Sequence, residues 1–260
     1  MNAIEKTLSM LEAIAASDDG SSLAELSISA GVPKPTAHRI LQILAGGDYV
    51  ETDGKGSYHA GPALIALAGN VFGALQLTRS ARATVLDLRG KTGFTVHLAV
   101  RNGDRAIYVD KAEANLPFQM VSRVGMTIPL HCTSIGKAIL AALPQTEALG
   151  LLSSVSLERR TPNTLTSVEE VLADLESVRK RGYSIDEEEN ELGVRCIGAA
   201  VYNSIGDVVG AVSISALIFL LSPDKVDETG QTVRDAAATI SAALGARTKP
   251  QVDDRRRALP

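Results

Sequence analysis

The segment that most constrains the fold is Leu23–Leu44, which reads as two short helices meeting at a tight corner. Apolar residues recur at helical spacing on both sides of the corner. Gly31 can adopt the left-handed conformation that such a corner needs. Pro33 and Pro35 allow a helix only from that point on, because proline is tolerated in a first helical turn but not in an interior. We therefore predict a helix-turn-helix, with an ordinary helical hairpin as the alternative.

The second helix of this motif has a buried stripe and a polar, basic face. Residues at the start of a recognition helix reach base edges in the major groove, and basic side chains nearby contact phosphates. We expect Thr36, His38 and Arg39 to read bases and Lys34 to contact a phosphate. The residues predicted to face outward are Lys34, Thr36, His38, Arg39 and Gln42, opposite the apolar stripe of Ala37, Ile40, Leu41 and Leu44.

A hairpin is predicted directly after the second helix. Two short extended pieces, Tyr49–Glu51 and Ser57–His59, flank the turn sequence Asp-Gly-Lys-Gly. A helix from about Asn2 to Ala16 precedes the motif. Three helices and a two-stranded wing make a winged helix over residues 1–61, with Lys55 placed to reach a phosphate or the minor groove.

The charge of this part is opposite to that of a typical DNA-binding domain. Residues 1–60 carry four Lys or Arg and eight Asp or Glu, and the whole chain has a net charge of −4. A protein that relies on general phosphate attraction should be basic. If the chain binds DNA, it must use a few well-placed cations, presented in several copies.

Composition indicates a soluble globular protein, with 45% hydrophobic and 22% charged residues. Two cysteines fit a reducing cytoplasm, no apolar run is long enough to span a membrane, and the start of the chain is an amphipathic helix rather than a signal peptide. Phosphate-binding glycine loops and metal-ligand spacings are absent, so we predict no cofactor, no metal and no catalytic residues.

The remainder of the chain predicts an α+β domain at residues 79–246, after a nearly uncharged linker helix at residues 62–78 that we expect to pack against a partner subunit or the following domain. Residues 247–260 are polar and predicted to be disordered. The expected strands lie at residues 94–100, 105–111, 118–123, 182–185, 196–202 and 208–215, and the expected helices at residues 62–77, 80–91, 134–142, 145–151, 167–180 and 224–244.

A small-ligand pocket is indicated by sparse polar residues on apolar elements. Ser134 lies where a polar connector opens into a helix, and backbone N–H groups at a helix start bind anions. Ser213 and Ser215 point to one face of a strand, Cys196 lies on another strand, and Asp186 precedes it. The alternatives are a capped helix without ligand, and a buried core cysteine or a nucleophile paired with His97 or His131.

The whole pattern resembles the IclR family of bacterial transcriptional regulators. The resemblance covers residues 2 to about 246 and rests on ordered motifs that include IEKTLSMLEAIA, YHAGPALIAL, RVGMTIPLHCTSIGKAILA and VRKRGYSIDEEENELGVRC. It implies a winged helix, a dimerising linker helix and a GAF-like antiparallel effector domain. It also implies dimers that can pair into tetramers on operator DNA, and a small, often carboxylate-bearing metabolite as effector.

The matching effector positions are Ser134, Ile135, Asp186, Cys196, Ser213 and Ser215, with Met120, Ile128 and Val194 near the apolar wall. Many relatives have Gly or Ala at the helix start, so Ile135 would reshape the cavity and the effector's identity does not carry over. Two rival functions remain: a cytoplasmic enzyme that uses Cys196 and keeps the winged helix for assembly, and a repressor without an effector.

Overall fold

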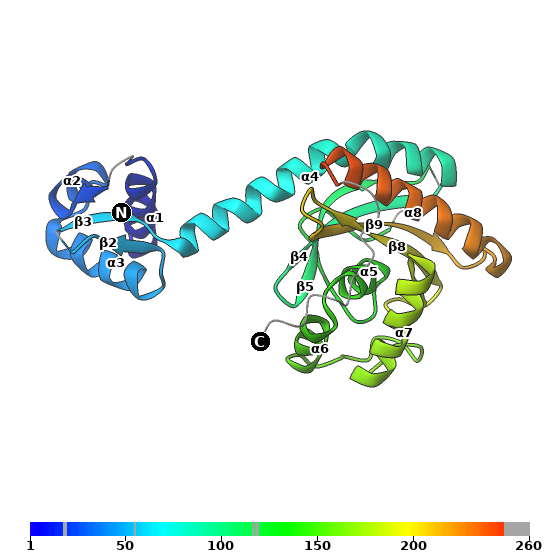
Figure 1. Ribbon diagram of the computed structural model, residues 1–260. Helices are drawn as coiled ribbons and strands as arrows, with labels where there is room; N and C mark the ends of the chain where they lie inside the picture. Colours follow the sequence, from blue (N-terminus) through cyan, green and yellow to red (C-terminus); the bar gives the residue numbers. More distant parts are fainter. Residues whose placement is uncertain (18–19, 55, 116, 118–119, 247–260) are drawn as a thin grey trace. The chain divides into compact units, whose positions relative to one another are not determined.

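Figure 1 shows the computed structural model of the chain, which describes residues 1–17, 20–54, 56–115, 117 and 120–246. The chain divides into two compact units, Met1–Gly73 and Ala74–Pro260, and their boundary falls inside helix α4 (Pro62–Thr92). Among the described helices, none has the length and apolar content needed to cross a bilayer.

Three helices form the body of the first unit: α1 (Ala3–Ala15), α2 (Leu23–Ser29) and α3 (Lys34–Gly46). Asn2 and Ser22 cap α1 and α2, and in each case a glutamate three residues on returns a hydrogen bond to the cap. The predicted stripe of α3 is buried together with residues of α1 and α2. The fully buried members of this core are Met10, Ile14, Leu26, Val32, Ala37, Leu41 and Val50.

The wing of the first unit is a small antiparallel sheet in the order β1-β3-β2. Its strands are β1 (Ser21–Ser22), β2 (Val50–Thr52) and β3 (Ser57–Ala60). The hairpin predicted between helix and linker is confirmed, and β1 adds a third strand that two serines in a connector did not predict. Lys55, at the tip of the hairpin, lies outside the described residues.

Helix α4 is a single helix of 31 residues. The prediction of two helical segments, 62–77 and 80–91, was wrong in this respect because no proline or glycine interrupts residues 77–81. Leu77, Ala81, Val85 and Leu88 keep one buried stripe through the join.

The second unit is built on a six-stranded antiparallel sheet in the order β6-β5-β4-β9-β8-β7. Helix α8 and the C-terminal half of α4 cover one face, and α5, α6 and α7 cover the other (Figure 1). The strands are β4 (Thr95–Asn102), β5 (Arg105–Ala112), β6 (Thr127–Pro129), β7 (Ser184–Glu187), β8 (Val194–Tyr202) and β9 (Val208–Leu217). The helices are α5 (Ser134–Ala142), α6 (Gln145–Ser153), α7 (Val168–Arg181) and α8 (Val226–Ala243), the last preceded by a short 3-10 turn at Pro223–Lys225.

One predicted strand is wrong. Residues 120–123 of the expected strand 118–123 form no strand, residues 118 and 119 lie outside the described residues, and the outermost strand is β6 instead. The Lys111 ammonium donates to the carbonyl oxygens of Met120 (3.0 Å) and Ser122 (2.7 Å). A side chain therefore occupies backbone acceptors that a strand would use for its ladder.

Candidate functional site

The exposed face of α3 carries the residues that the sequence assigned to DNA. Lys34, His38, Arg39 and Gln42 are exposed and Thr36 is half-buried. Within the described residues, no hydrogen bond or ion pair engages the side chains of Lys34, His38 or Arg39. These side chains are therefore available to a partner outside the chain.

The corner before α3 is fixed by a local clip. Gly31 has a φ of 63°, the left-handed conformation predicted for it. Val32 N–H donates to the Ser27 carbonyl oxygen (3.0 Å), and the Ser27 hydroxyl donates to the Val32 carbonyl oxygen (2.6 Å). Ser27 is buried, so this reciprocal pair satisfies polar groups that would otherwise be stranded in the core and sets the angle between the two helices.

A polar row crosses one face of the large sheet in the second unit. Strand register places Asp186, Cys196, Ser215 and Thr95 side by side on β7, β8, β9 and β4. Directly opposite residues of antiparallel strands share a face, so all four point to the same side. Their strand neighbours Ile185, Ile197, Ile214 and Val96 point to the other side and pack under α4 and α8.

A second row runs beside the first and contains Ser184, Gly198, Ser213 and His97. Ser213 and Ser215 share this face, as their period-two spacing predicted. The structure thus places Asp186, Cys196, Ser213 and Ser215 close together on one face of the sheet, although they come from three different strands.

The start of α5 lies against these rows. The Ser184 hydroxyl donates to the Ser134 carbonyl oxygen (2.5 Å), and Gly198 allows the close approach, since a Cβ there would lie 2.8 Å from the Ser134 carbonyl carbon. The Thr133 hydroxyl caps the Gly136 N–H at 3.1 Å. Among the described residues, no acceptor pairs with the backbone N–H groups of Ser134 and Ile135, which remain the free donors of this helix start.

Asp186 is a buried carboxylate at the end of the first row. Its Oδ1 accepts from the backbone N–H groups of Glu189 (2.8 Å) and Asn190 (3.2 Å). Burial, reinforced by the nearby Glu189 carboxylate, raises the pKa of Asp186 to about 7, against the lowering effect of those two hydrogen bonds. Near neutral pH this side chain is therefore poised between a hydrogen-bond donor and an anion.

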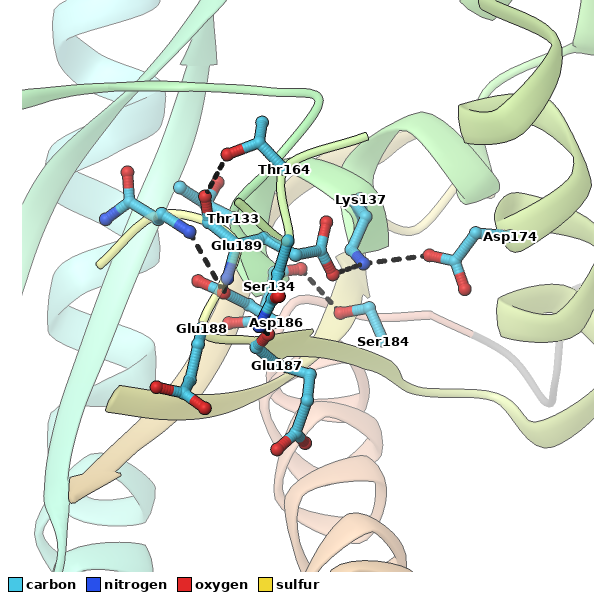
Figure 2. Close-up of polar contacts among 12 residues, drawn as sticks. Thr133, Ser134, Lys137, Thr164, Asp174, Ser184, Asp186, Glu187, Glu188 and Glu189 are labelled. Atoms are coloured by element: carbon cyan, nitrogen blue, oxygen red, sulfur yellow. Dashed lines mark hydrogen bonds and ion pairs between the residues drawn. The ribbon is translucent and has the colours of Figure 1, made fainter. Parts of the chain in front are cut away.

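A buried ion cluster ties the helix start to the segment after Asp186 (Figure 2). Lys137, on the first turns of α5, is 1% exposed and contacts the carboxylates of Glu189 and Asp174, the latter at 2.8 Å. Burial alone would lower the pKa of Lys137, but the two carboxylates raise it. Lys137 thus stays charged and holds α5, α7 and the turn at residues 187–190 together.

The acidic cluster at residues 186–191 is engaged by the protein itself. Glu187 pairs with Arg195, the Glu188 carboxylate accepts from Gly193 N–H (2.7 Å), and Glu189 pairs with Lys137. No group of three or more potential metal ligands occurs in the part of the chain that the structure describes.

Cys196 is half-buried, and its thiol donates to the Ser215 hydroxyl at 3.1 Å. Burial, followed by the Asp186 charge, raises the pKa of the Cys196 thiol well above its usual value. A nucleophilic cysteine needs a lowered pKa, because the thiolate is the reactive form. His131, the other proposed partner, donates from Nε2 to the backbone carbonyl oxygen of Glu158 instead (3.1 Å).

The apolar positions implied by the resemblance differ in exposure. Ile128 and Ile135 are buried in the core between the sheet and α5–α7. Met120 is half-buried, and Val194 is buried at the start of β8.

His97, which belongs to the second row, and Tyr108 next to it were not assigned to the effector site from sequence. The His97 ring lies 4.7 Å from the Tyr108 ring, and its Nδ1 lies 3.4 Å from the Ser215 hydroxyl. Burial, assisted by Lys111, lowers the pKa of His97 to about 3, so the imidazole is neutral. The alternation of residues 94–100 already placed His97 opposite the apolar face of its strand, which is the signal that could have identified it.

Comparison with known proteins agrees with this arrangement. The IclR helix-turn-helix domain matches residues 3–54, and the C-terminal domain of the bacterial transcriptional regulator IclR matches residues 70–242. The HTH-type transcriptional repressor AllR of Klebsiella pneumoniae is 33% identical over 252 residues, covering 96% of this chain and 92% of the relative.

Solved structures give the same result. The IclR crystal structure from Thermotoga maritima is 32% identical with a TM-score of 0.65, covering 94% of this chain and 99% of that one. An IclR homologue from Microbacterium hydrocarbonoxydans, complexed with 4-hydroxybenzoate, shares the fold at 24% identity and a TM-score of 0.61, covering 94% and 99%. The predicted α+β fold class, with its N-terminal helix-turn-helix, is confirmed, and the chain belongs to the IclR family of bacterial transcriptional regulators.

Proposed function

We propose that this regulator binds operator DNA through the exposed face of α3, and that a small, carboxylate-bearing effector in the second unit modulates that binding. The observation that carries the proposal is the set of polar rows, which lie on one face of an otherwise apolar sheet beneath the start of α5. The DNA-contacting residues are Lys34, Thr36, His38, Arg39 and Lys55, and the effector-contacting residues are Ser134, Ile135, Asp186, Cys196, Ser213 and Ser215, with Met120 and Ile128 at the wall.

Arg39 is the residue on which discrimination between DNA sequences should depend most. Its guanidinium is exposed and can bond the O6 and N7 atoms of guanine together, which is worth roughly 1–3 kcal/mol per half-site. Because the first 60 residues carry a net negative charge, general attraction to phosphates contributes little, and at least two copies per operator are needed.

Operator DNA selected from a random library by the full-length protein provides the assay for this interface. Arg39→Ala should abolish the preference for selected over random DNA while the circular-dichroism spectrum is unchanged. Arg39→Lys is the matched control, since it keeps the charge but loses the bidentate geometry; it should keep binding to random DNA and still lose the preference. Unchanged selectivity in both variants would remove Arg39 from the interface.

The chemistry of the effector site supports a small organic acid. The N–H groups at the start of α5 favour a carboxylate, and the hydroxyl, thiol and Asp186 groups offer further hydrogen bonds on a largely buried surface. The relative complexed with 4-hydroxybenzoate supports the inclusion of aromatic acids among the candidates.

Thermal-shift measurements with pyruvate, lactate, benzoate and 4-hydroxybenzoate test this site. A ligand at about a hundredfold over its dissociation constant adds roughly 2.7 kcal/mol of stability. The shift should fall in Ser215→Ala and persist in Ser153→Ala, a matched exposed serine of α6. If acids of this kind, extended to a wider panel, stabilise neither the protein nor its DNA complex, the effector-free repressor is the better description.

The alternative function, an enzyme that uses Cys196 as its nucleophile, is disfavoured because the Cys196 thiol is protonated and hydrogen-bonded.

We propose that the chain is not an enzyme and acts in the cytoplasm as a dimer, or as a pair of dimers, through its linker helix. The relative named as a transcriptional repressor supports repression as the direction of control. A Cys196→Ser variant that still represses would separate the regulator from the enzyme.

A further inference from the structure

A continuous hydrogen-bond chain leaves the proposed effector site through His97. The Cys196 thiol donates to Ser215, the Ser215 hydroxyl lies 3.4 Å from His97 Nδ1, and His97 Nε2 lies 2.7 Å from the Ser122 hydroxyl. The chain therefore crosses from β8 and β9 to β4, and then to the loop that precedes β6.

The His97 ring must remain neutral in this position. It is 2% exposed, and the Lys111 ammonium lies close enough to disfavour a second positive charge. A neutral imidazole has one N–H donor and one acceptor nitrogen. Consequently, if the Ser215 hydroxyl donates to Nδ1, then Nε2 donates to Ser122; if Ser215 accepts, Ser122 must donate. The donor or acceptor role of the Ser215 hydroxyl therefore determines the role of the Ser122 hydroxyl.

The far end of the chain is a loop held by side chains. Lys111 donates to the backbone carbonyl groups of Met120 and Ser122, while His97 contacts the Ser122 side chain. On either side of Ser122 the loop presents Val121 and Val124 to solvent, with exposed fractions of 83% and 56%. The loop's position thus depends on polar contacts from β4 and β5, and not on a buried apolar face of its own.

We propose that His97 is a positioning residue of the effector site, whose ring links the Ser215 hydroxyl to the loop at residues 120–126. The inference rests on the proposed function. If the Ser215 hydroxyl turns from Nδ1 to a ligand acceptor, Nδ1 must donate to Ser215, so Nε2 becomes the acceptor and the Ser122 hydroxyl must donate to it. His97 thereby also discriminates between hydrogen-bond donors and acceptors on a ligand. The ligand group that contacts Ser215 must be compatible with the tautomer of His97 for which Ser122 can supply the matching hydrogen bond.

The link can be tested without any ligand, by hydrogen exchange with mass spectrometry on the full-length protein. Ser215→Ala should raise exchange in residues 120–126 by about fivefold, the factor that one hydrogen bond of ordinary strength supports. In a His97→Phe background, Ser215→Ala should add nothing further. Ser213→Ala is the matched control, because Ser213 is the strand partner of His97 on the same face but has no hydrogen bond to its ring among the described contacts.

Two results would overturn the proposal. In the first, Ser215→Ala leaves hydrogen exchange in residues 120–126 unchanged although His97→Phe raises it. His97 would then hold the loop by packing alone. In the other, Ser213→Ala has the same effect as Ser215→Ala. If His97→Phe does not fold, nitrogen-15 spectra of the His97 ring replace it: Ser215→Ala and Ser122→Ala must shift the tautomer, and Ser213→Ala must not. Either failure leaves the thermal-shift test of effector binding untouched.

Discussion

Removing the Lys137 ammonium should destabilise the second unit strongly, because it strands a buried carboxylate. In Lys137→Met the side chain keeps its length but Glu189, 6% exposed, loses its cation. Asp174 is less affected, since its side chain is 23% exposed and Arg181 lies 3.8 Å away. Breaking a buried ion pair from one side costs about 3–5 kcal/mol. For a unit of this size the melting temperature should fall by roughly 6–20 °C.

The pH dependence of this loss identifies its cause. Burial already raises the pKa of Glu189, and the loss of Lys137 raises it further. A carboxylate whose folded pKa lies above its unfolded value of about 4.3 destabilises the fold when it ionises, so the deficit should be largest at neutral pH and shrink as the pH falls toward 5.

Circular-dichroism melts of the full-length protein between pH 5 and 8 provide the assay. Adding Glu189→Gln to Lys137→Met should restore much of the lost stability, because the stranded charge is gone. A loss below about 1 kcal/mol, or one that does not vary across this pH range, would refute the role of a stranded charge.

Three further predictions follow from the described contacts. Asp186→Asn should become more stable relative to the wild type as the pH rises from about 4 to 7 in thermal melts, because the wild-type carboxyl, with its pKa raised to about 7, must ionise while buried; a constant difference would contradict this. Gly198→Ala should cost about 1–3 kcal/mol by forcing a Cβ against Ser134, whereas Gly150→Ala in α6, where no described atom lies within 4 Å, should be neutral or stabilising in the same melts. Ser27→Ala should lower stability by about 1–3 kcal/mol by leaving the buried Val32 carbonyl without its hydroxyl donor, and weaken operator binding in gel-shift assays; equal binding and stability would show that the corner needs no clip.

Local features of the fold were predictable because their causes lie within a few residues. Gly31 and the prolines fixed the corner before α3, and the turn at Gly103, with a φ of 64°, closed the hairpin of β4 and β5. Helix α5 was predicted with the correct ends because Thr133 and the following apolar stripe mark it directly.

Features that depend on long-range contacts were not predictable in the same way. The predicted strand at residues 118–123 was wrong because the Lys111 ammonium binds the carbonyl oxygens of Met120 and Ser122, which lie nine and eleven residues further along the chain. Asp186, Cys196 and Ser215 could be identified as polar residues on or near apolar strands, and the family resemblance matched the same positions. Their common row, however, depends on strand register, which one sequence does not supply. The contact of His97 with Ser215, 118 residues apart, has the same origin.

The alternation of the large sheet has a consequence for how such regulators diverge. Thr95, Ser215 and Cys196 face one side, while Val96, Ile214 and Ile197 face the other and form the apolar core. Mutations can therefore exchange the polar side chains without opening a cavity beneath α4 and α8. The core beneath α4 and α8 is thus kept when the polar row changes, and the cost of such a change falls on the packing against α5 instead.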